Sequence, residues 1–299
     1  MNDEQQKLAH EAAELEQSQE WSQAADRWNE LSQQVDDPQL TFKAAQSLFR
    51  AKRFQEAYQS ALHLPDELIN EDNGLLIIKI YVAVNHYISG RMAANQLPAS
   101  IQTQARELIA ESEKNYRQQY QATVHNRLRN FYHLGDCNLS EQQQRLANAD
   151  QLPLPDFMVG CQFLLRDPFT NPFVRSELLN ILQRLKWDQE VVMLTIDDQD
   201  HRVTPADCQS AYQSDAIRQC RKIVANQFTD NNPQLLATLN QQLDLQAILL
   251  APIADQIIVD PAKWIQVLEC LLLGEAMPAD SSDEQQWQNK INRIIEKIN

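Results

Sequence analysis

The chain has 299 residues, of which 43% are hydrophobic and 22% are charged, so it can bury the core of one or two soluble domains. Only 5 residues are glycine, against a usual share of about 7%, which disfavours tight hairpins and loops that cradle phosphate. The formal net charge of −15 repels phosphate backbones, so we expect no binding to nucleic acid.

The cysteines and the apolar runs give no sign of a metal site or of a membrane segment. The five cysteines are Cys137, Cys161, Cys208, Cys220 and Cys270. No Cys-x-x-Cys pair and no Cys/His cluster with zinc spacing occurs, so we expect reduced thiols and no bound metal. The acidic N-terminal stretch lacks the apolar core of a signal peptide, and the longest apolar runs are too short to span a bilayer. We therefore predict a cytoplasmic protein.

In chain order, apolar residues at helical spacing predict helices over about 3–19 and 22–35, followed by helices over 39–51 and 53–64. Each packing residue of the second pair follows its counterpart in the first pair by the same number of residues, the number that separates Ala12 from Ala45. We call this sequence separation the repeat offset. Under it, Ala12, Leu15, Trp21, Ala24, Trp28 and Leu31 fall on Ala45, Leu48, Phe54, Ala57, Ala61 and Leu64. The small residues allow two helices to approach closely, and the large ones fill the space between layers.

A third, degenerate unit follows the first two. It consists of an apolar helix over 75–88, with Ala83 at the small-residue position, and of Gly90 at the turn. The next helix begins near Pro98, because proline suits the first turn of a helix. A further short stretch therefore separates the turn at Gly90 from that helix. The apolar stripe of that helix predicts a length of about 30 residues, ending before Gly135.

The second half begins at a boundary that we place between residues 134 and 135. It has no evident repeat. β-Branched residues around the polar sequence DDQD predict one hairpin near 190–204, with strands over 191–196 and 201–204. Helices are predicted over 156–165, 172–187, 205–212, 215–228, 233–251, 261–273 and from 282 to the end.

The two helical pairs resemble the tetratricopeptide repeat, whose period is about 34 residues. The second half, with an NPF helix start, a strand pair and a VTP helix start, is similar to uncharacterised tetratricopeptide-related proteins of low-GC Gram-positive bacteria. This resemblance implies an all-α fold: a tetratricopeptide-like superhelix over 1–134 and a helical domain over 135–299 carrying one short β-hairpin. It also implies an interaction scaffold, with no catalytic residue.

In the resembling family, the residues that face the concave groove lie one helical turn from the packing positions. Carried onto this sequence, they are Ala13, Glu16 and Gln17 in the first unit, Phe42, Gln46, Phe49 and Arg50 in the second, and Tyr87 in the third. Gln46 and Arg50 are one turn apart, so both can reach a peptide backbone or a carboxylate. The alternative is an ordinary solvated surface, with Phe42 and Phe49 buried by the next layer.

Two further clusters have a functional and a structural interpretation. Asp197, Asp198, Asp200 and His201 offer oxygen ligands at alternate positions, as calcium or magnesium prefers, but the glycine and glutamate of the EF-hand pattern are missing. We interpret them as a polar hairpin turn. Basic and aromatic residues interleave over 114–132, as in some nucleic-acid-binding surfaces, and we interpret this stretch as a solvated helix face beside a core stripe.

No motif indicates catalysis. His10, His63, His86 and His133 belong to no catalytic pattern, and the nucleophile elbow, the P-loop, the dinucleotide fingerprint and the HExxH zinc motif are all absent. A triad built from distant residues remains open. We predict a non-enzymatic protein without a cofactor that binds another protein or peptide, or a second copy of itself. The alternative is a small-molecule-binding or enzymatic C-terminal domain, with the solenoid as a targeting or self-association element.

Overall fold

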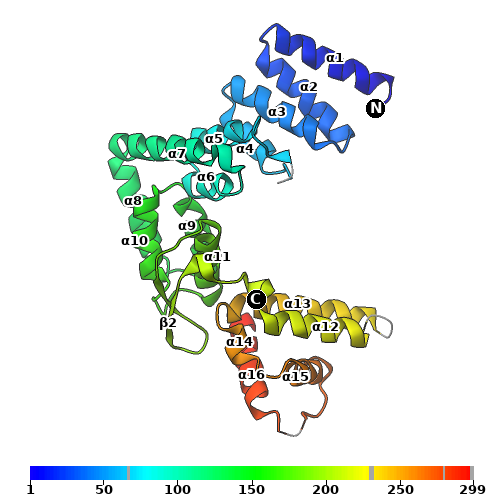
Figure 1. The fold of residues 1–299 in the computed structure, drawn as a ribbon, viewed down its shortest axis with the longest axis vertical. Helices are drawn as coiled ribbons and strands as arrows, with labels where there is room; N and C mark the ends of the chain where they lie inside the picture. Colours follow the sequence, from blue (N-terminus) through cyan, green and yellow to red (C-terminus); the bar gives the residue numbers. More distant parts are fainter. Residues whose placement is uncertain (66–67, 229–231, 279, 297–299) are drawn as a thin grey trace. The chain divides into compact units, whose positions relative to one another are not determined.

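Sixteen α-helices and one two-stranded hairpin make up the regular structure of the described residues, 1–65, 68–228, 232–278 and 280–296, in a computed structural model (Figure 1). The predicted all-α fold with one short β-hairpin is confirmed. No helix in these ranges combines the length and the apolar character that crossing a bilayer requires.

The chain divides into two compact units. The first contains Met1–Arg129 and Asn148–Phe157, and the second contains Asn130–Ala147 and Met158–Asn299. We predicted a boundary between residues 134 and 135, whereas the chain leaves the first unit earlier, between Arg129 and Asn130, and returns to it for Asn148–Phe157. The return of this segment has no counterpart in the division expected from the sequence.

Consecutive antiparallel helices build the first unit. They are α1 (Asp3–Gln17), α2 (Trp21–Gln34), α3 (Pro38–Arg50), α4 (Phe54–Ala61), α5 (Gly74–Ala83), α6 (Tyr87–Ala94) and α7 (Ala99–Gln119). α2 packs against both α1 and α3, and α7 packs against α5 and α6 (Figure 1). Asp37 caps α3 by accepting the backbone N–H of Gln39 at 2.9 Å, and Pro38 supplies the first helical residue; both residue types are common at these positions of a helix.

The turns inside the three helical pairs have one backbone conformation. A left-handed residue occupies each of them, Gln19, Lys52 and Asn85, with φ of 61°, 61° and 62°. The next residue donates its N–H to the carbonyl five residues earlier: Glu20 to Leu15, Arg53 to Leu48 and His86 to Tyr81, at 2.8, 2.9 and 3.0 Å. The pairs α1–α2, α3–α4 and α5–α6 are therefore three copies of one unit, each separated from the next by the repeat offset.

The third unit keeps the spacing of the first two, which corrects two of our predictions. The helix expected over 75–88 is divided into α5 and α6 by the turn at Asn85, because asparagine tolerates the left-handed conformation. Gly90 is not in a turn but is buried within α6, at the position of Ala24 and Ala57. A Cβ atom at Gly90 would lie 3.3 Å from the Cβ of Tyr81, so α5 and α6 approach closely there.

The packing positions named by the repeat offset are largely buried. In the first two units the buried ones are Ala12, Ala24, Trp28, Leu31, Ala45, Leu48, Ala57, Ala61 and Leu64. In the third unit the same offset gives Ile78, Tyr81, Tyr87, Gly90, Ala94 and Leu97, of which only Tyr81 is partly exposed. Each unit thus buries a small residue in the first half of its second helix, which lets the neighbouring helix pack closely.

The single long helix predicted after Pro98 is divided at Tyr120. Tyr120 has φ −121° and ψ 41°, outside the helical region, and separates α7 from α8 (Gln121–Tyr132). The unit boundaries near residues 129, 147 and 157 fall within α8, α9 (Leu139–Ala149) and α10 (Leu154–Leu164). These three helices are therefore shared between the units along the chain.

The second unit contains the hairpin and the remaining helices. They are α11 (Pro172–Arg184), β1 (Val191–Leu194), β2 (Asp200–Val203), α12 (Asp215–Phe228), α13 (Pro233–Leu250), α14 (Ala254–Ile257), α15 (Pro261–Leu273) and α16 (Ser282–Glu296). The strands are antiparallel, with Val191 opposite Val203 and Leu194 opposite Asp200. The helix predicted over 205–212 is instead two short 3₁₀ turns, η2 (Pro205–Asp207) and η3 (Ala211–Gln213). The last part of the helix predicted from 282 to the end, over 297–299, lies outside the described residues.

A buried polar network joins three helices of the second unit. The Trp264 indole N–H donates to Gln246 Oε1 at 2.8 Å, and the Gln246 amide donates to Gln288 Oε1 at 2.7 Å. All three side chains are fully buried, so these hydrogen bonds offset the cost of removing polar groups from water. The network fixes how α13, α15 and α16 pack.

Candidate functional site

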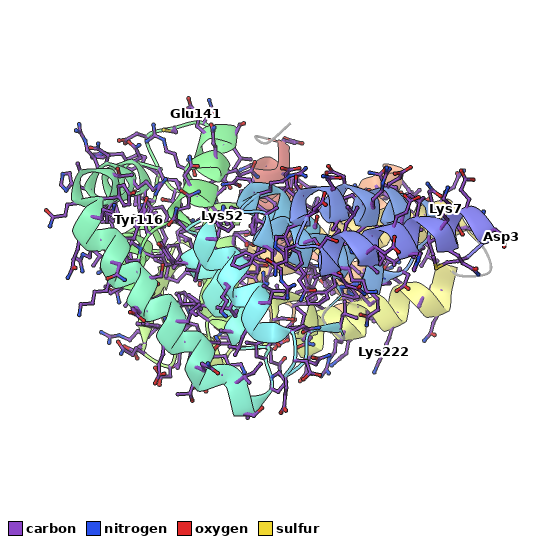
Figure 2. The ribbon with its side chains drawn as sticks, turned by 90° about the horizontal axis from the view of Figure 1, so that it is seen from above. Asp3, Lys7, Lys52, Tyr116, Glu141 and Lys222 are labelled. Carbon is purple, nitrogen blue, oxygen red and sulfur yellow. The ribbon has the colours of Figure 1, made fainter. Side chains whose placement is uncertain are left out.

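Tyr87, which we predicted to face a groove, lies in the core. It is 0% exposed, and its hydroxyl donates to Asn85 Oδ1 at 2.9 Å. Its ring centroid is 5.6 Å from that of Tyr116, which Figure 2 labels on α7. By the repeat offset it corresponds to Trp21 and Phe54, the first residues of α2 and α4. Tyr87 is a packing residue, so its assignment to a groove was wrong.

Glu16 connects three helices of the first unit. Its Oε1 atom accepts hydrogen bonds from the Trp28 indole N–H at 3.1 Å and from the Ser47 hydroxyl at 2.7 Å. The side chain therefore links α1 to both α2 and α3. This oxygen is engaged within the chain, so we assign Glu16 a structural role rather than the groove role that we predicted.

Phe42 and Phe49 are half-buried and pack against the core cluster that contains Ala45 and Leu48. The Phe49 ring centroid lies 5.4 Å from that of Phe54, at the start of α4. Aromatic pairs at this distance stabilise packing beyond the area that they bury. Both side chains are thus partly buried by the next layer, which was the alternative interpretation for these residues.

Gln17, Gln46 and Arg50 remain at the surface of the first unit. Gln17 and Arg50 are exposed and Gln46 is half-buried. The Arg50 guanidinium carbon lies 4.4 Å from the Trp21 ring centroid, a cation–π contact between the end of α3 and the start of α2. A guanidinium held in this way has a restricted position and still carries N–H donors that match a carboxylate.

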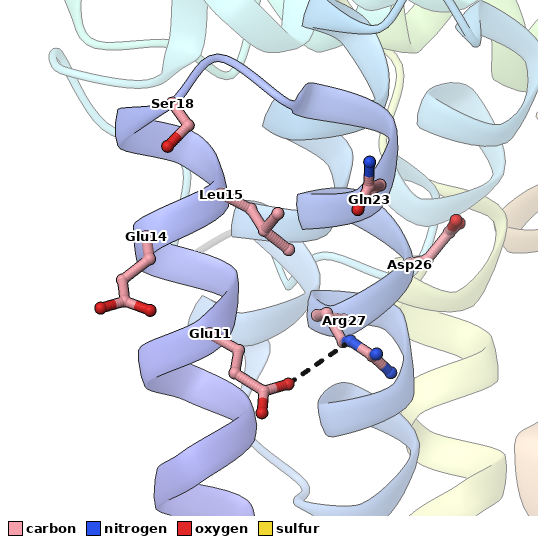
Figure 3. Close-up of a pocket in the computed structure, with 7 residues that line it drawn as sticks. All are labelled: Glu11, Glu14, Leu15, Ser18, Gln23, Asp26 and Arg27. Carbon is pink, nitrogen blue, oxygen red and sulfur yellow. Dashed lines mark ion pairs between the residues drawn. The ribbon is translucent and has the colours of Figure 1, made fainter.

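The first unit also has a pocket of about 620 Å³ between α1 and α2 (Figure 3). Its lining residues are Glu11, Glu14, Leu15, Ser18, Gln23, Asp26 and Arg27. Arg27 Nε lies 3.6 Å from Glu11 Oε2, the contact dashed in Figure 3. Three carboxylates and a single cation give the pocket a negative charge.

The repeat explains the position of this pocket. Three of its residues correspond, one repeat offset later, to buried residues of α3: Glu11 to Ala44, Glu14 to Ser47 and Leu15 to Leu48. On α3 this face packs against the first helical pair, whereas on α1 the same face carries carboxylates. It therefore lacks the apolar surface that another unit of the same kind would need, as is typical of the end unit of a helical stack.

The acidic cluster at the hairpin is a hydrogen-bonded turn. Asp197 accepts the Thr195 hydroxyl at 2.5 Å, the Gln199 backbone N–H at 3.0 Å and His201 Nε2 at 2.8 Å. Burial, the largest single influence, raises the pKa of Asp197, but these hydrogen bonds together outweigh it and lower that pKa. Asp198, at φ 63°, forms an ion pair with Lys290 instead.

Asp200, the third carboxylate of the cluster, pairs with Arg166 at 3.4 Å. The carboxylates are thus directed to separate partners. Over the residues that the structure describes, no group of three or more His, Cys, Asp or Glu side chains is placed to hold a metal ion. The hydrogen bonds account for the hairpin cluster without a ligand.

The structure contains a histidine–carboxylate pair that we did not predict from the sequence. His86 Nδ1 contacts Asp150 Oδ2, 64 residues away. Asp150 Oδ1 also accepts the Ser89 backbone N–H at 2.6 Å, and its carbonyl accepts that of Ile88 at 3.2 Å. Asp150 therefore caps the free N–H groups of the first turn of α6. No local signal marks this pair, because its members are distant in the sequence and lie on separate elements.

The pockets of the second unit bear on the alternative that this unit binds a small molecule. A pocket formed by α11, η3 and α13 has a volume of about 100 Å³, below the range of about 300–1,000 Å³ typical of ligand sites. Residues 197–201 of the hairpin do not line it. This pocket therefore does not support the alternative. A second pocket of the unit, along α16, has a volume of about 550 Å³, within that range, and is lined by Gln286, Trp287, Asn289, Lys290 and Arg293.

Neither models of known protein families, nor curated proteins, nor solved structures match this chain.

Proposed function

We propose that the first unit is a protein-binding module of the tetratricopeptide kind and that the protein is a non-enzymatic scaffold. The repeated turn at Gln19, Lys52 and Asn85 carries this proposal, because it relates three helical pairs by one spacing. Stacked helical pairs expose extended surfaces on which another chain can lie. The repeat offset is close to the tetratricopeptide period of about 34 residues.

The contact residues that we propose are Gln46 and Arg50, together with Gln17. Gln46 and Arg50 are one turn apart on α3, so a peptide along this helix meets an amide and a guanidinium at adjacent positions. Arg50 supplies donors for a carboxylate, and Gln46 pairs with a peptide group. The partner that fits is an extended segment or a helix of another protein.

A second copy of this chain is a poorer partner for the face of the first unit that carries the pocket between α1 and α2. The pocket between α1 and α2 carries Glu11, Glu14 and Asp26, so two copies that meet through this face would oppose like charges. We therefore take a different protein as the partner and use the oligomeric state, measured by light scattering, as an accompanying observation.

Affinity purification from native cells with mass spectrometry tests the proposal. The tagged wild-type chain is compared with the Gln46→Ala/Arg50→Glu variant and with Lys52→Glu, which makes the same charge change in the neighbouring turn. We expect proteins captured by the wild type and by Lys52→Glu to be lost from the double variant. Capture of the same proteins by all three chains, with circular dichroism showing intact folds, would contradict the assignment of the contact residues.

A further inference from the structure

A second pocket of the first unit lies between α7 and the segment that contains Pro153 and Pro155. Its volume is about 430 Å³, within the range of about 300–1,000 Å³ typical of small-molecule sites. One side is lined by Ala110, Glu113, Lys114, Arg117 and Gln118 of α7 and by Gln121 of α8, and the other by the two prolines. The proposed protein-binding residues do not contribute to this pocket.

Hydrogen bonds and ion pairs hold the two sides together. Glu113, which is 5% exposed, accepts Arg91 Nε at 2.8 Å and Arg91 Nη2 at 2.6 Å. The same carboxylate accepts the backbone N–H of Leu154, between the two prolines, at 3.2 Å. Arg117 Nη2 lies 3.1 Å from Asp156 Oδ1. The pocket is therefore preformed, which lowers the entropic cost of binding a ligand.

One cationic side chain at the pocket has no carboxylate partner among the described residues. Glu113 is neutralised by Arg91, and Asp156 by Arg117, whereas Lys114 has no ion pair among the described residues. Lys114, Arg117 and Gln118 occupy positions i, i+3 and i+4, so they share one face of α7. The amides of Gln118 and Gln121 are exposed and add uncharged donors to this face.

We propose that this pocket binds a small monocarboxylate, with the carboxylate at Lys114 and the apolar part against Pro153 and Pro155. One uncompensated cation matches a monoanion better than a doubly charged phosphate. The negative end of the α7 dipole opposes an anion with about half a charge, and the full charge of Lys114 in direct contact outweighs it. The acidic surface elsewhere is screened beyond about 8 Å at physiological ionic strength.

Binding of hexanoate to the full chain tests this inference, followed through the NMR signals of the backbone over 110–121 and of the glutamine side-chain amides. Hexanamide, with the same shape and no charge, and inorganic phosphate are the comparison probes. We expect saturable shifts with hexanoate and about tenfold weaker binding of hexanamide, because a hydrogen bond to a charged group is lost. Phosphate should bind more weakly than hexanoate.

The matched variants are Lys114→Gln in the pocket and Lys222→Gln, an exposed lysine of α12. Hexanoate should bind Lys114→Gln about tenfold more weakly and Lys222→Gln as it binds the wild type. Equal binding of hexanoate and hexanamide, tighter binding of phosphate, no shift with hexanoate, or an unchanged affinity of Lys114→Gln each overturns the inference. Both variants replace lysines that form no ion pair among the described residues, and their amide spectra report whether the fold is retained.

Discussion

Asn85 and Lys52, separated by one repeat offset, share one left-handed backbone conformation, with φ of 62° and 61°. Gln19, one repeat offset before Lys52, has φ of 61°. The three side chains differ, so the repeat is maintained within this chain in its backbone geometry rather than in the residue type at the turn. The hydrogen bond from the following residue to the carbonyl five residues earlier imposes this geometry on each turn.

Lys52→Gly should stabilise the first unit. A left-handed conformation costs a non-glycine residue about 1–2 kcal/mol, and glycine removes this cost from the folded state. Part of the gain is lost, because glycine also increases the conformational entropy of the unfolded chain. We expect the free energy of unfolding in urea to rise by about 0.5–1 kcal/mol. Lys52→Ala should leave it nearly unchanged and Lys52→Val should lower it, so a loss of stability with glycine contradicts the role assigned to the turn.

Glu16→Ala should destabilise the contacts between α1, α2 and α3. The change leaves the Trp28 indole N–H and the Ser47 hydroxyl without their acceptor, at a cost of about 1–3 kcal/mol. Glu16→Gln keeps an acceptor oxygen and should cost less. Thermal unfolding measures both variants, with Glu14→Ala, on the exposed side of α1, as the control. An equal, small effect of Glu16→Ala and Glu14→Ala would place Glu16 outside the packing network.

Arg91→Met should be among the more damaging single substitutions in the first unit. It leaves the Glu113 carboxylate buried without its cation, which costs about 3–5 kcal/mol. Chemical denaturation should show this loss, and the Leu154 amide should exchange its hydrogen faster because its acceptor is disturbed. Adding Glu113→Leu to Arg91→Met should recover part of the stability. Arg129→Met, at an exposed position of α8, is the control.

Asp156 predicts a pH dependence of stability. Burial, the largest influence, raises the pKa of Asp156 above its ordinary value of 3.8, and Arg117 opposes this rise. Between the two pKa values the folded state binds more protons than the unfolded state, so the free energy of unfolding falls as pH increases. The free energy of unfolding of the wild type minus that of Asp156→Asn should therefore decrease as pH rises through that window.

Arg117→Gln provides the companion measurement for Asp156. Without the guanidinium, the pKa of Asp156 should rise further, so the fall in stability with pH should extend to higher pH. Urea titrations at a series of pH values give both curves. A difference between the wild type and Asp156→Asn that increases with pH would mean that the ion pair with Arg117 prevails over burial.

Periodicity predicted the first two helical pairs because each has its full set of packing residues at the repeat offset. The same offset also identifies the third unit, where Gly90 continues Ala24 and Ala57. We assigned Gly90 to a turn because glycine commonly marks turns. In α6 it is a small residue at a close helix contact instead, because a Cβ atom added at Gly90 would lie 3.3 Å from the Cβ of Tyr81. Composition alone does not separate these two uses of glycine.

The candidate site was harder to predict than the fold. A family pattern selects the helix face but does not show whether a side chain on it is occupied within the chain. Glu16 is held by Trp28 and Ser47, and Tyr87 is covered by its neighbours. The two partners of Glu16 lie 12 and 31 positions away from it in the sequence, and these contacts depend on how the layers stack. Gln17 and Arg50 keep the exposed position that the prediction requires, and Gln46 is half-buried.

The cap that Asp150 places on α6 has a consequence for the design of protein fragments. A truncated chain that stops at residue 134 would lack the acceptors for the Ile88 and Ser89 amides, and Glu113 would lose its contact with Leu154. Such a fragment would fray at α6 and expose apolar surface around Tyr87. Any expression boundary intended to isolate the N-terminal helices has to lie beyond Phe157.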